Sequence, residues 1–232
     1  ATESIESDIA IETGTLLELA PQEFVDCVPN PEECGGTGGC QGATAELAFN
    51  YTMTAGQILN KDYTYTAHTG QCKLKKLPAT AAGIKSFVKL PINEYAPLLA
   101  AVNKQPISIS VDASKWQTYE GGVFKGCPTS TSETVDIDHA VQLVGYGTDA
   151  GTDYFIVRNS WTNHWGEKGC ACPSPPPRPL LTAAPCCARI GNVDRRICAQ
   201  SSGSTRRAPR PARASRTPRP WTATAARAAP PR

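Results

Sequence analysis

The chain has 232 residues, of which 40% are hydrophobic and 19% charged, a composition that permits a packed core in one large or two small domains. No stretch reaches the roughly 18 consecutive apolar residues of a membrane-spanning helix, so we expect none. The first residue is Ala1 and the only methionine is Met53, so we expect a processed protein or a fragment.

The net charge of +2 conceals two parts of opposite charge. Residues 1–169 hold 11 Lys and Arg against 20 Asp and Glu, whereas residues 170–232 hold 12 against 1. The second part also contains 13 Ala and 12 Pro in 63 residues, so it has too little apolar area to offset the entropy of ordering. We therefore predict a disordered tail over 170–232. One interpretation of the tail is a basic arm that binds nucleic acid or membrane. The interpretation that we favour is an artefact of reading frame or splicing.

The first part of the chain predicts helices joined by a loop. Apolar residues one turn apart predict a helix within residues 1–20 that ends near Gly14. Residues 21–26 predict a short helix that opens with proline, and residues 28–42 a loop rich in Pro, Gly and Cys. Helical spacing returns over residues 43–51.

From residue 79 onward the pattern favours strands. Residues 84–90 predict a strand, residues 94–103 a helix, and the alternation over residues 107–111 a half-buried strand. Two further apolar runs follow at 141–147 and 154–157. Helices in the first half and strands in the second indicate an α+β fold rather than a wound parallel sheet.

Two clusters in the strand-rich part carry chemistry. The first is centred on His139, and the second contains Asn159 and Trp161. A lone histidine is commonly structural, but an imidazole also serves as a general base or as the ion-pair partner of a nucleophile. In that second role Asn159 could accept a hydrogen bond from the ring and fix its tautomer, and Trp161 could shield that bond from water.

Five motifs in order resemble those of papain-like cysteine peptidases. They are Leu19 to Cys27, Cys40-Gln41-Gly42-Ala43, Tyr119 to Phe124, Asp138-His139-Ala140 with Gly145-Tyr146-Gly147, and Asn159-Ser160-Trp161 with Trp165 to Gly169. The resemblance covers residues 1–169. It implies a two-lobed papain-like fold, with a helical lobe over about 1–78, a β-barrel lobe over 79–169, and the active site in the cleft between them.

The same resemblance implies the roles of individual residues. His139 pairs with a nucleophilic thiolate and then protonates the leaving amine, while Asn159 orients the ring and Trp161 covers their contact. No metal or cofactor is implied. Substrate binding is implied for a further set: Gly42, Ala43, Ala45, Ser110, Asp138, Ala140 and Trp165.

The sequence also departs from the family at both ends. The nucleophile motif C-G-S-C-W-A-F-S is absent, and residues 1–5 resemble the helix that follows it. Cys170 stands where the family has an aromatic residue that begins its last strand, and after Gly169 no family pattern continues, so we expect the last strands of the barrel to be missing. The function expected is therefore that of a cysteine-type endopeptidase, present here as an inactive fragment whose nucleophile lies upstream of residue 1. The alternative is a catalytically inactive homologue that acts as a binding module.

Ten cysteines favour an oxidising compartment. The resemblance implies a lysosome or vacuole or the extracellular space. The resemblance implies a Cys27–Cys72 disulfide. It pairs Cys40 with a cysteine upstream of residue 1 and Cys127 with one in the family's C-terminal region. A zinc site at Cys34 and Cys40 is the rival interpretation, and no second closely spaced pair in residues 1–169 supports it.

The expected partners follow from the same resemblance. They are peptide or protein substrates, together with protein inhibitors or a propeptide, and no specific nucleic acid. Asn50-Tyr51-Thr52 is in addition a formal N-glycosylation sequon within a predicted helix.

Overall fold

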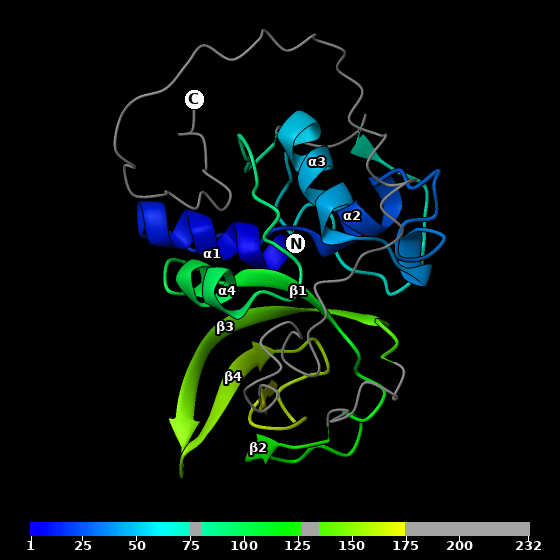
Figure 1. Ribbon diagram of the computed structural model, residues 1–232. Helices are drawn as coiled ribbons and strands as arrows, with labels where there is room; N and C mark the ends of the chain where they lie inside the picture. The colour runs from blue at the N-terminus through cyan, green and yellow to red at the C-terminus, as the bar shows by residue number, and fades with distance from the viewer. Residues whose placement is uncertain (75–79, 127–134, 175–232) are drawn as a thin grey trace, which may run out of the picture.

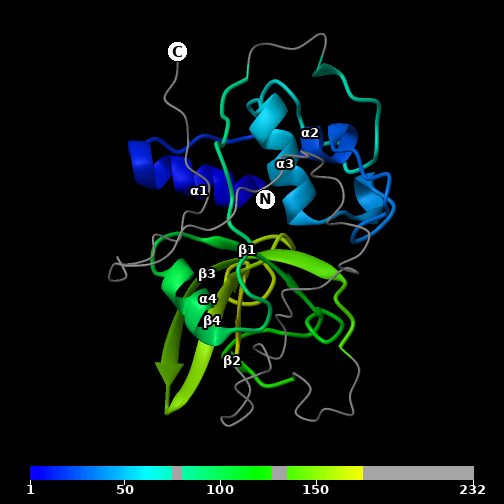
Figure 2. The same cartoon turned by 45° about the horizontal axis from the view of Figure 1, so that its top comes forward.

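A computed structural model describes residues 1–74, 80–126 and 135–174 of the chain. Figure 1 shows helices α1 (Thr2–Thr13), α2 (Pro21–Cys27) and α3 (Ala45–Ala55) on one side and the strands on the other. Helix α4 (Tyr95–Val102) lies against the sheet, and the turned view in Figure 2 keeps the same division. The segregation of helices from strands agrees with the α+β class that the sequence predicts.

Helix α1 forms where the spacing of its apolar residues predicts it. Ile5 and Ile9 lie on one face and are buried in a cluster with Leu19 and Ile84. The helix ends at Gly14, whose φ of 73° is left-handed and whose N–H closes the last turn on the carbonyl of Ala10. Burial of the apolar face and this C-terminal cap together fix the length of α1.

The predicted strand over residues 84–90 is wrong. Just before it, Ala82 forms an isolated bridge with Gln57, but no strand continues through the segment. Phe87 instead packs on Phe49 of α3 with ring centroids 5.4 Å apart, and Val88 is 48% exposed. The apolar side chains of this segment are therefore explained by packing onto a helix rather than by pairing in a sheet.

The described strands form one mixed sheet. They are β1 (Ile107–Val111), β2 (Val123–Phe124), β3 (His139–Asp149), β4 (Thr152–Arg158) and β5 (Cys170–Pro173), in the order β1-β3-β4-β5-β2. Only β2 and β5 pair in parallel. Helix α4 covers the sheet through Leu98 and Val102, which join its buried core. Closure into a barrel and the division at residues 78/79 stay predictions.

Strand β5 corrects the expectation that no family strand follows Gly169. Cys170 pairs with Arg158 and Ala171 with Val157, and Ala171 is only 2% exposed. Backbone groups supply the hydrogen bonds of a ladder, so a cysteine in place of an aromatic residue does not prevent pairing. Residues 170–173 are thus part of the sheet, and the Ser174 N–H donates to the carbonyl of Phe124 in β2. The rest of the predicted tail, 175–232, and Cys127 lie outside the described residues.

Polar contacts join α1 to the sheet. Ser4 Oγ lies 3.0 Å from Ser108 Oγ of β1, and Gln142 Nε2 of β3 donates to Ser7 Oγ at 3.1 Å. Residues 108 and 142 are partners in the β1–β3 register, so their side chains project from the same face of the sheet. This face therefore meets the helices through hydroxyl and amide groups, while the core face is apolar.

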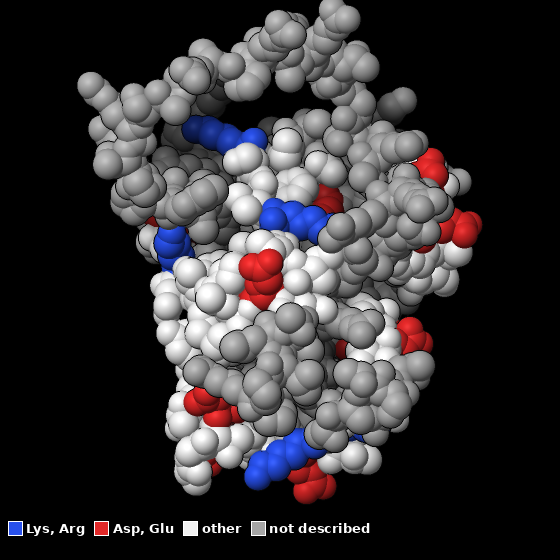
Figure 3. Space-filling view, in the orientation of Figure 1, with Lys and Arg blue, Asp and Glu red and all other residues white. Residues whose placement is uncertain are grey.

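Two further features of the described residues concern helix length and surface charge. Among the described helices, none has both the length and the apolar character that a membrane crossing needs. On the face drawn in Figure 3, the described Lys, Arg, Asp and Glu side chains are scattered, and neither sign gathers into an extended patch.

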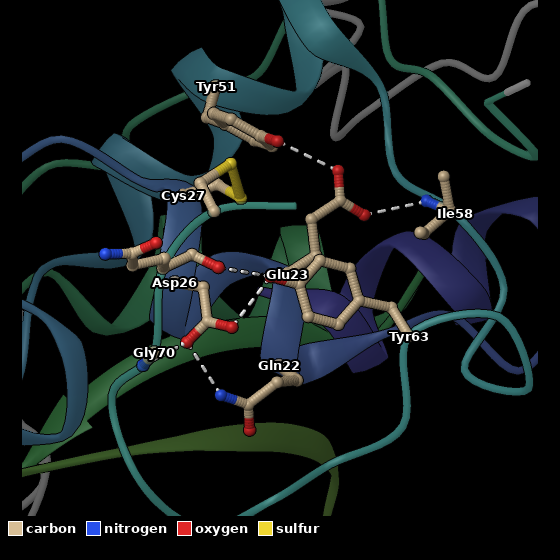
Figure 4. The surroundings of a disulfide bond; sticks show 10 residues. Gln22, Glu23, Asp26, Cys27, Tyr51, Ile58, Tyr63 and Gly70 are labelled. Carbon is tan, nitrogen blue, oxygen red and sulfur yellow. Dashed lines mark hydrogen bonds between the residues drawn. A yellow bond between two sulfur atoms is a disulfide. The ribbon is translucent and has the colours of Figure 1, made fainter. Parts of the chain in front are cut away.

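A disulfide and a carboxylate fasten α2 to the loop before residue 74 (Figure 4). Cys27, the last residue of α2, is bonded to Cys72, as the resemblance implies. The neighbouring Asp26 carboxylate accepts hydrogen bonds from the Tyr63 hydroxyl and the Gly70 N–H, both at 2.7 Å. One covalent and several polar links therefore hold this loop against one helical turn.

A second carboxylate in Figure 4 is fully buried. Glu23 is 1% exposed and accepts hydrogen bonds from the Tyr51 hydroxyl at 2.9 Å and the Ile58 N–H at 2.8 Å. Burial raises the pKa of Glu23, and these two donors oppose the rise. Glu23 thereby ties α2 both to α3 and to the segment that follows α3.

We expect Asp26→Asn to weaken the protein at neutral pH and to reduce its acid sensitivity. Burial alone would raise the pKa of Asp26, but hydrogen bonds from Tyr63, Gly70 and Gln22 outweigh it and lower the pKa. A lowered folded pKa gives stability that is present above the unfolded value of about 4 and lost as the pH falls through the folded value. Thermal unfolding at pH 6 and pH 3 measures both effects.

The control for this prediction is Asp62→Asn, at an exposed position of the same loop. It should leave both the melting temperature at pH 6 and its fall at pH 3 close to those of the parent protein. If the melting temperatures of Asp26→Asn and of the parent protein fall by the same amount between pH 6 and pH 3, the carboxylate of Asp26 does not cause the acid sensitivity.

Candidate active site

Two strands bring His139 and Asn159 together. His139 is the first residue of β3, paired with Val111 of β1, and Asn159 directly follows Arg158, the last residue of β4. His139 Nε2 lies 2.8 Å from Asn159 Oδ1. Strands β3 and β4 are antiparallel neighbours, so the start of one meets the end of the other, and residues 20 apart in sequence come into contact.

The hydrogen bonds of Asn159 define the tautomer of His139. The Ser160 N–H donates to Asn159 Oδ1 at 2.8 Å, which identifies that atom as the acceptor oxygen. An amide oxygen only accepts, so His139 Nε2 donates and carries the proton. In the neutral ring Nδ1 is then unprotonated and available to take a proton. Asn159 is 6% exposed and His139 is half-buried, so the asparagine end of this bond is shielded from water.

A chain of three tryptophan rings connects the imidazole of His139 to the hydrophobic core. Trp161 stacks on His139 with centroids 5.2 Å apart and an interplanar angle of 25°, and Trp165 meets Trp161 edge-on at 5.2 Å. Trp165 in turn stacks on Trp116 at 6.0 Å and donates its Nε1–H to the Trp116 carbonyl. Trp116 is 1% exposed in the core, so the ring of His139 is braced against the hydrophobic core.

Trp116 is the member of this group that the sequence analysis did not identify. No local pattern marks it, because it lies 23 residues before His139 and belongs to none of the five motifs. The available signal was composition: the chain has four tryptophans, and the other two in the described residues already belonged to a motif. Grouping these rare large aromatic residues would have pointed to it.

Three of the expected substrate-binding residues flank His139. Asp138 accepts a hydrogen bond from the Ala113 N–H at 2.9 Å and is exposed. Ala140 is exposed and pairs with Ser110 of β1, so their side chains share one sheet face. That face is the one through which the sheet meets α1. Asp138, Ser110 and Ala140 thus lie at or beside the end of β3 that carries His139.

The other expected substrate-binding residues belong to the helical side. Gly42 follows the short 3₁₀ helix η1 (Gly39–Gln41), and its φ of 97° is a conformation that favours glycine. Ala43 continues the loop, and Ala45 is the first residue of α3. Among the residues that the structure describes, no hydrogen bond joins these three to His139 or Asn159. Their place in a shared site stays a prediction.

The described free cysteines do not supply a thiolate to His139. Burial raises the pKa of Cys170, and burial, together with a contact of its Sγ to Glu167 Oε2 at 3.4 Å, raises the pKa of Cys172 to about 11. Cys40 is free and exposed. In residues 1–74, 80–126 and 135–174 no cysteine makes a hydrogen bond with the ring, and no group of three metal-binding side chains forms.

Residues 1–172 match the model of a protein family described as "Papain family cysteine protease". The chain belongs to the papain family of cysteine proteases. Oryzain beta chain of Oryza sativa subsp. japonica is 39% identical over 173 residues, covering 73% of this chain and 35% of the relative. Vignain of Vigna mungo is 40% identical over 171 residues, covering 72% and 44%. The papain-family chain thus spans less than half the length of these relatives.

Solved structures of the family share the fold. Bromelain from Ananas comosus in complex with the E64 inhibitor superposes with a TM-score of 0.68 at 32% identity, covering 81% of this chain and 82% of that one. A recombinant stem bromelain precursor gives a TM-score of 0.68 at 33% identity, covering 81% and 59%. The fold of the described residues is therefore papain-like.

Proposed function

We propose that this chain carries the imidazole part of a cysteine endopeptidase active site, and that sequence preceding Ala1 supplies the thiol. The observation that supports it is the 2.8 Å hydrogen bond from His139 Nε2 to Asn159 Oδ1, made by an imidazole ring that stacks on Trp161. That bond leaves Nδ1 facing away from Asn159, free to accept the thiol proton. Membership of the papain family supports the same assignment.

In the proposed reaction, His139 takes the proton of the thiol and becomes an imidazolium. The ion pair stabilises the thiolate, which attacks the substrate carbonyl and forms a thioester as the peptide C–N bond breaks. His139 gives its proton to the leaving amine, and water then hydrolyses the thioester with His139 as base. His139 is the catalytic residue; Asn159 and Trp161 position its ring and shield the hydrogen bond.

The residues on either side of the proposed site bind the substrate. Gly42 and Ala43 form backbone hydrogen bonds with an extended peptide, as the edge of a sheet does. A side-chain pocket is proposed between Ala45 on the helical side and Ser110 and Ala140 on the sheet. Asp138 and Trp165 are further proposed substrate-binding residues of this site.

Partners and compartment follow from this function. We propose peptide or protein substrates and an inhibitory propeptide or protein inhibitors, since relatives are described with E64 and as precursor or proform. The compartment proposed is a lysosome or vacuole or the extracellular space, which the Cys27–Cys72 disulfide favours.

Covalent labelling tests the proposal. The protein expressed from its complete coding sequence and the 232-residue chain are each incubated with E-64 and digested for mass spectrometry. We expect one labelled cysteine, upstream of Ala1, in the complete protein and hydrolysis of a fluorogenic peptide. The 232-residue chain should show neither. Peptide binding without labelling or hydrolysis by the complete protein would instead establish the alternative, an inactive binding module.

A further inference from the structure

Helix α3 carries a glycosylation sequence on its surface. Asn50-Tyr51-Thr52 is the only Asn-X-Ser/Thr triplet of the chain, and it lies within α3 rather than in a loop. Asn50 is exposed, whereas Thr52 is 1% exposed. We propose that Asn50 carries an N-linked glycan and that the glycan is attached before α3 folds.

The order of events follows from the contacts of the triplet. The Thr52 hydroxyl donates to the Ala48 carbonyl at 2.9 Å in a buried position, and the Tyr51 hydroxyl donates to buried Glu23. The hydroxyl of an acceptor triplet has to be reached by the glycosylating enzyme. In the folded protein that hydroxyl is enclosed, so only the unfolded or nascent chain presents the triplet.

The transfer step uses a lipid-diphosphate-linked oligosaccharide as the second reactant. The Nδ2 atom of Asn50 forms a bond to the anomeric carbon of the first sugar. The bond from that carbon to the lipid diphosphate breaks, and the lipid diphosphate leaves while the amide loses one proton. The product keeps the side-chain amide of Asn50 and adds a bulky hydrophilic group to it.

The folded helix accommodates such a group at Asn50. Positions 46, 50, 53 and 54 lie along one side of α3, away from the buried Ala48 and Thr52, and 50, 53 and 54 are exposed. Met53, one turn after Asn50, is 43% exposed, so a glycan would cover apolar surface. In Figures 1 and 2, α3 lies on the helical side, away from the turn that joins β3 to β4.

The Cys27–Cys72 disulfide supports this modification independently. A disulfide indicates passage through an oxidising compartment, and N-linked glycans are attached on the same route. The inference does not depend on the proposed peptidase function, because it concerns a helix that contains neither His139 nor Asn159.

Expression behind a secretion signal in yeast tests the modification. Mass spectrometry of the peptide that contains Asn50 should show the added oligosaccharide on the 232-residue chain and on Thr52→Ser, which keeps the hydroxyl. Thr52→Val, similar in shape but without the hydroxyl, and Asn50→Asp should lack it. Cell-retained and secreted chains are both analysed, so a folding defect does not hide the result. An unmodified Asn50 in the parent chain would overturn the proposal.

A reconstituted transfer tests the order. Purified oligosaccharyltransferase and lipid-linked oligosaccharide are supplied with three substrates: unglycosylated folded chain, the same chain reduced and unfolded, and a peptide of residues 44–58. A peptide of that length is at most marginally helical in water. We expect modification of the unfolded chain and the peptide, and at least a tenfold slower reaction of the folded chain. Equal rates for folded and unfolded chain would contradict attachment before folding.

Discussion

His139→Ala in the protein expressed from its complete coding sequence should lower peptide turnover by at least about 10³-fold. Under the proposed mechanism, the variant loses both the proton acceptor and the cation that stabilises the thiolate. The thiol then returns toward its ordinary pKa of about 8.5, so its alkylation by iodoacetamide at pH 6 should slow by about 10²-fold. Turnover of a fluorogenic peptide and the alkylation rate are measured on the same preparations.

Asn159 supplies the comparison that separates catalysis from positioning. Asn159→Ala should lose less turnover than His139→Ala, because the ring remains but is no longer held by the 2.8 Å bond. Asn159→Asp keeps an acceptor oxygen and should recover part of that loss. His164→Ala, at an exposed histidine, is the matched control and should leave both rates unchanged. An unchanged alkylation rate in His139→Ala would refute the role assigned to the imidazole.

Removing the Cys27–Cys72 disulfide should lower the free energy of unfolding by about 4 kcal/mol. The bond joins residues 45 apart, and a chain-entropy argument gives a loss of that size for a loop of about this length. The double variant Cys27→Ala, Cys72→Ala also frees the loop that Asp26 holds through Tyr63 and Gly70. Urea unfolding followed by circular dichroism measures the difference.

Both variants are made in the 232-residue chain, and the matched control is Cys40→Ala, because Cys40 is free and exposed in that chain. It should change the free energy of unfolding by no more than about 0.5 kcal/mol, as surface substitutions usually do. A double variant that loses less than about 1 kcal/mol would show that polar contacts, rather than the disulfide, hold the loop to α2.

The local elements followed from the sequence because their causes are local. Apolar spacing predicted α1 and α4, and alternation predicted β1, since each pattern reflects one buried face of one element. The segment at 84–90 shows the limit of this reasoning. Its apolar residues predicted a strand, but Phe87 packs on Phe49 of α3, a contact that no periodicity within the segment encodes.

The sequence by itself determined the family and the residues to examine, because five ordered motifs are a property of the chain alone. Only the tertiary structure joined His139 to Asn159 and braced Trp161 through Trp165 on Trp116. It also paired β5 with β4 although the expected aromatic residue is absent. The physical reason is common to these cases: strand register and core packing join residues that are distant in sequence, and backbone hydrogen bonds do not depend on side-chain identity.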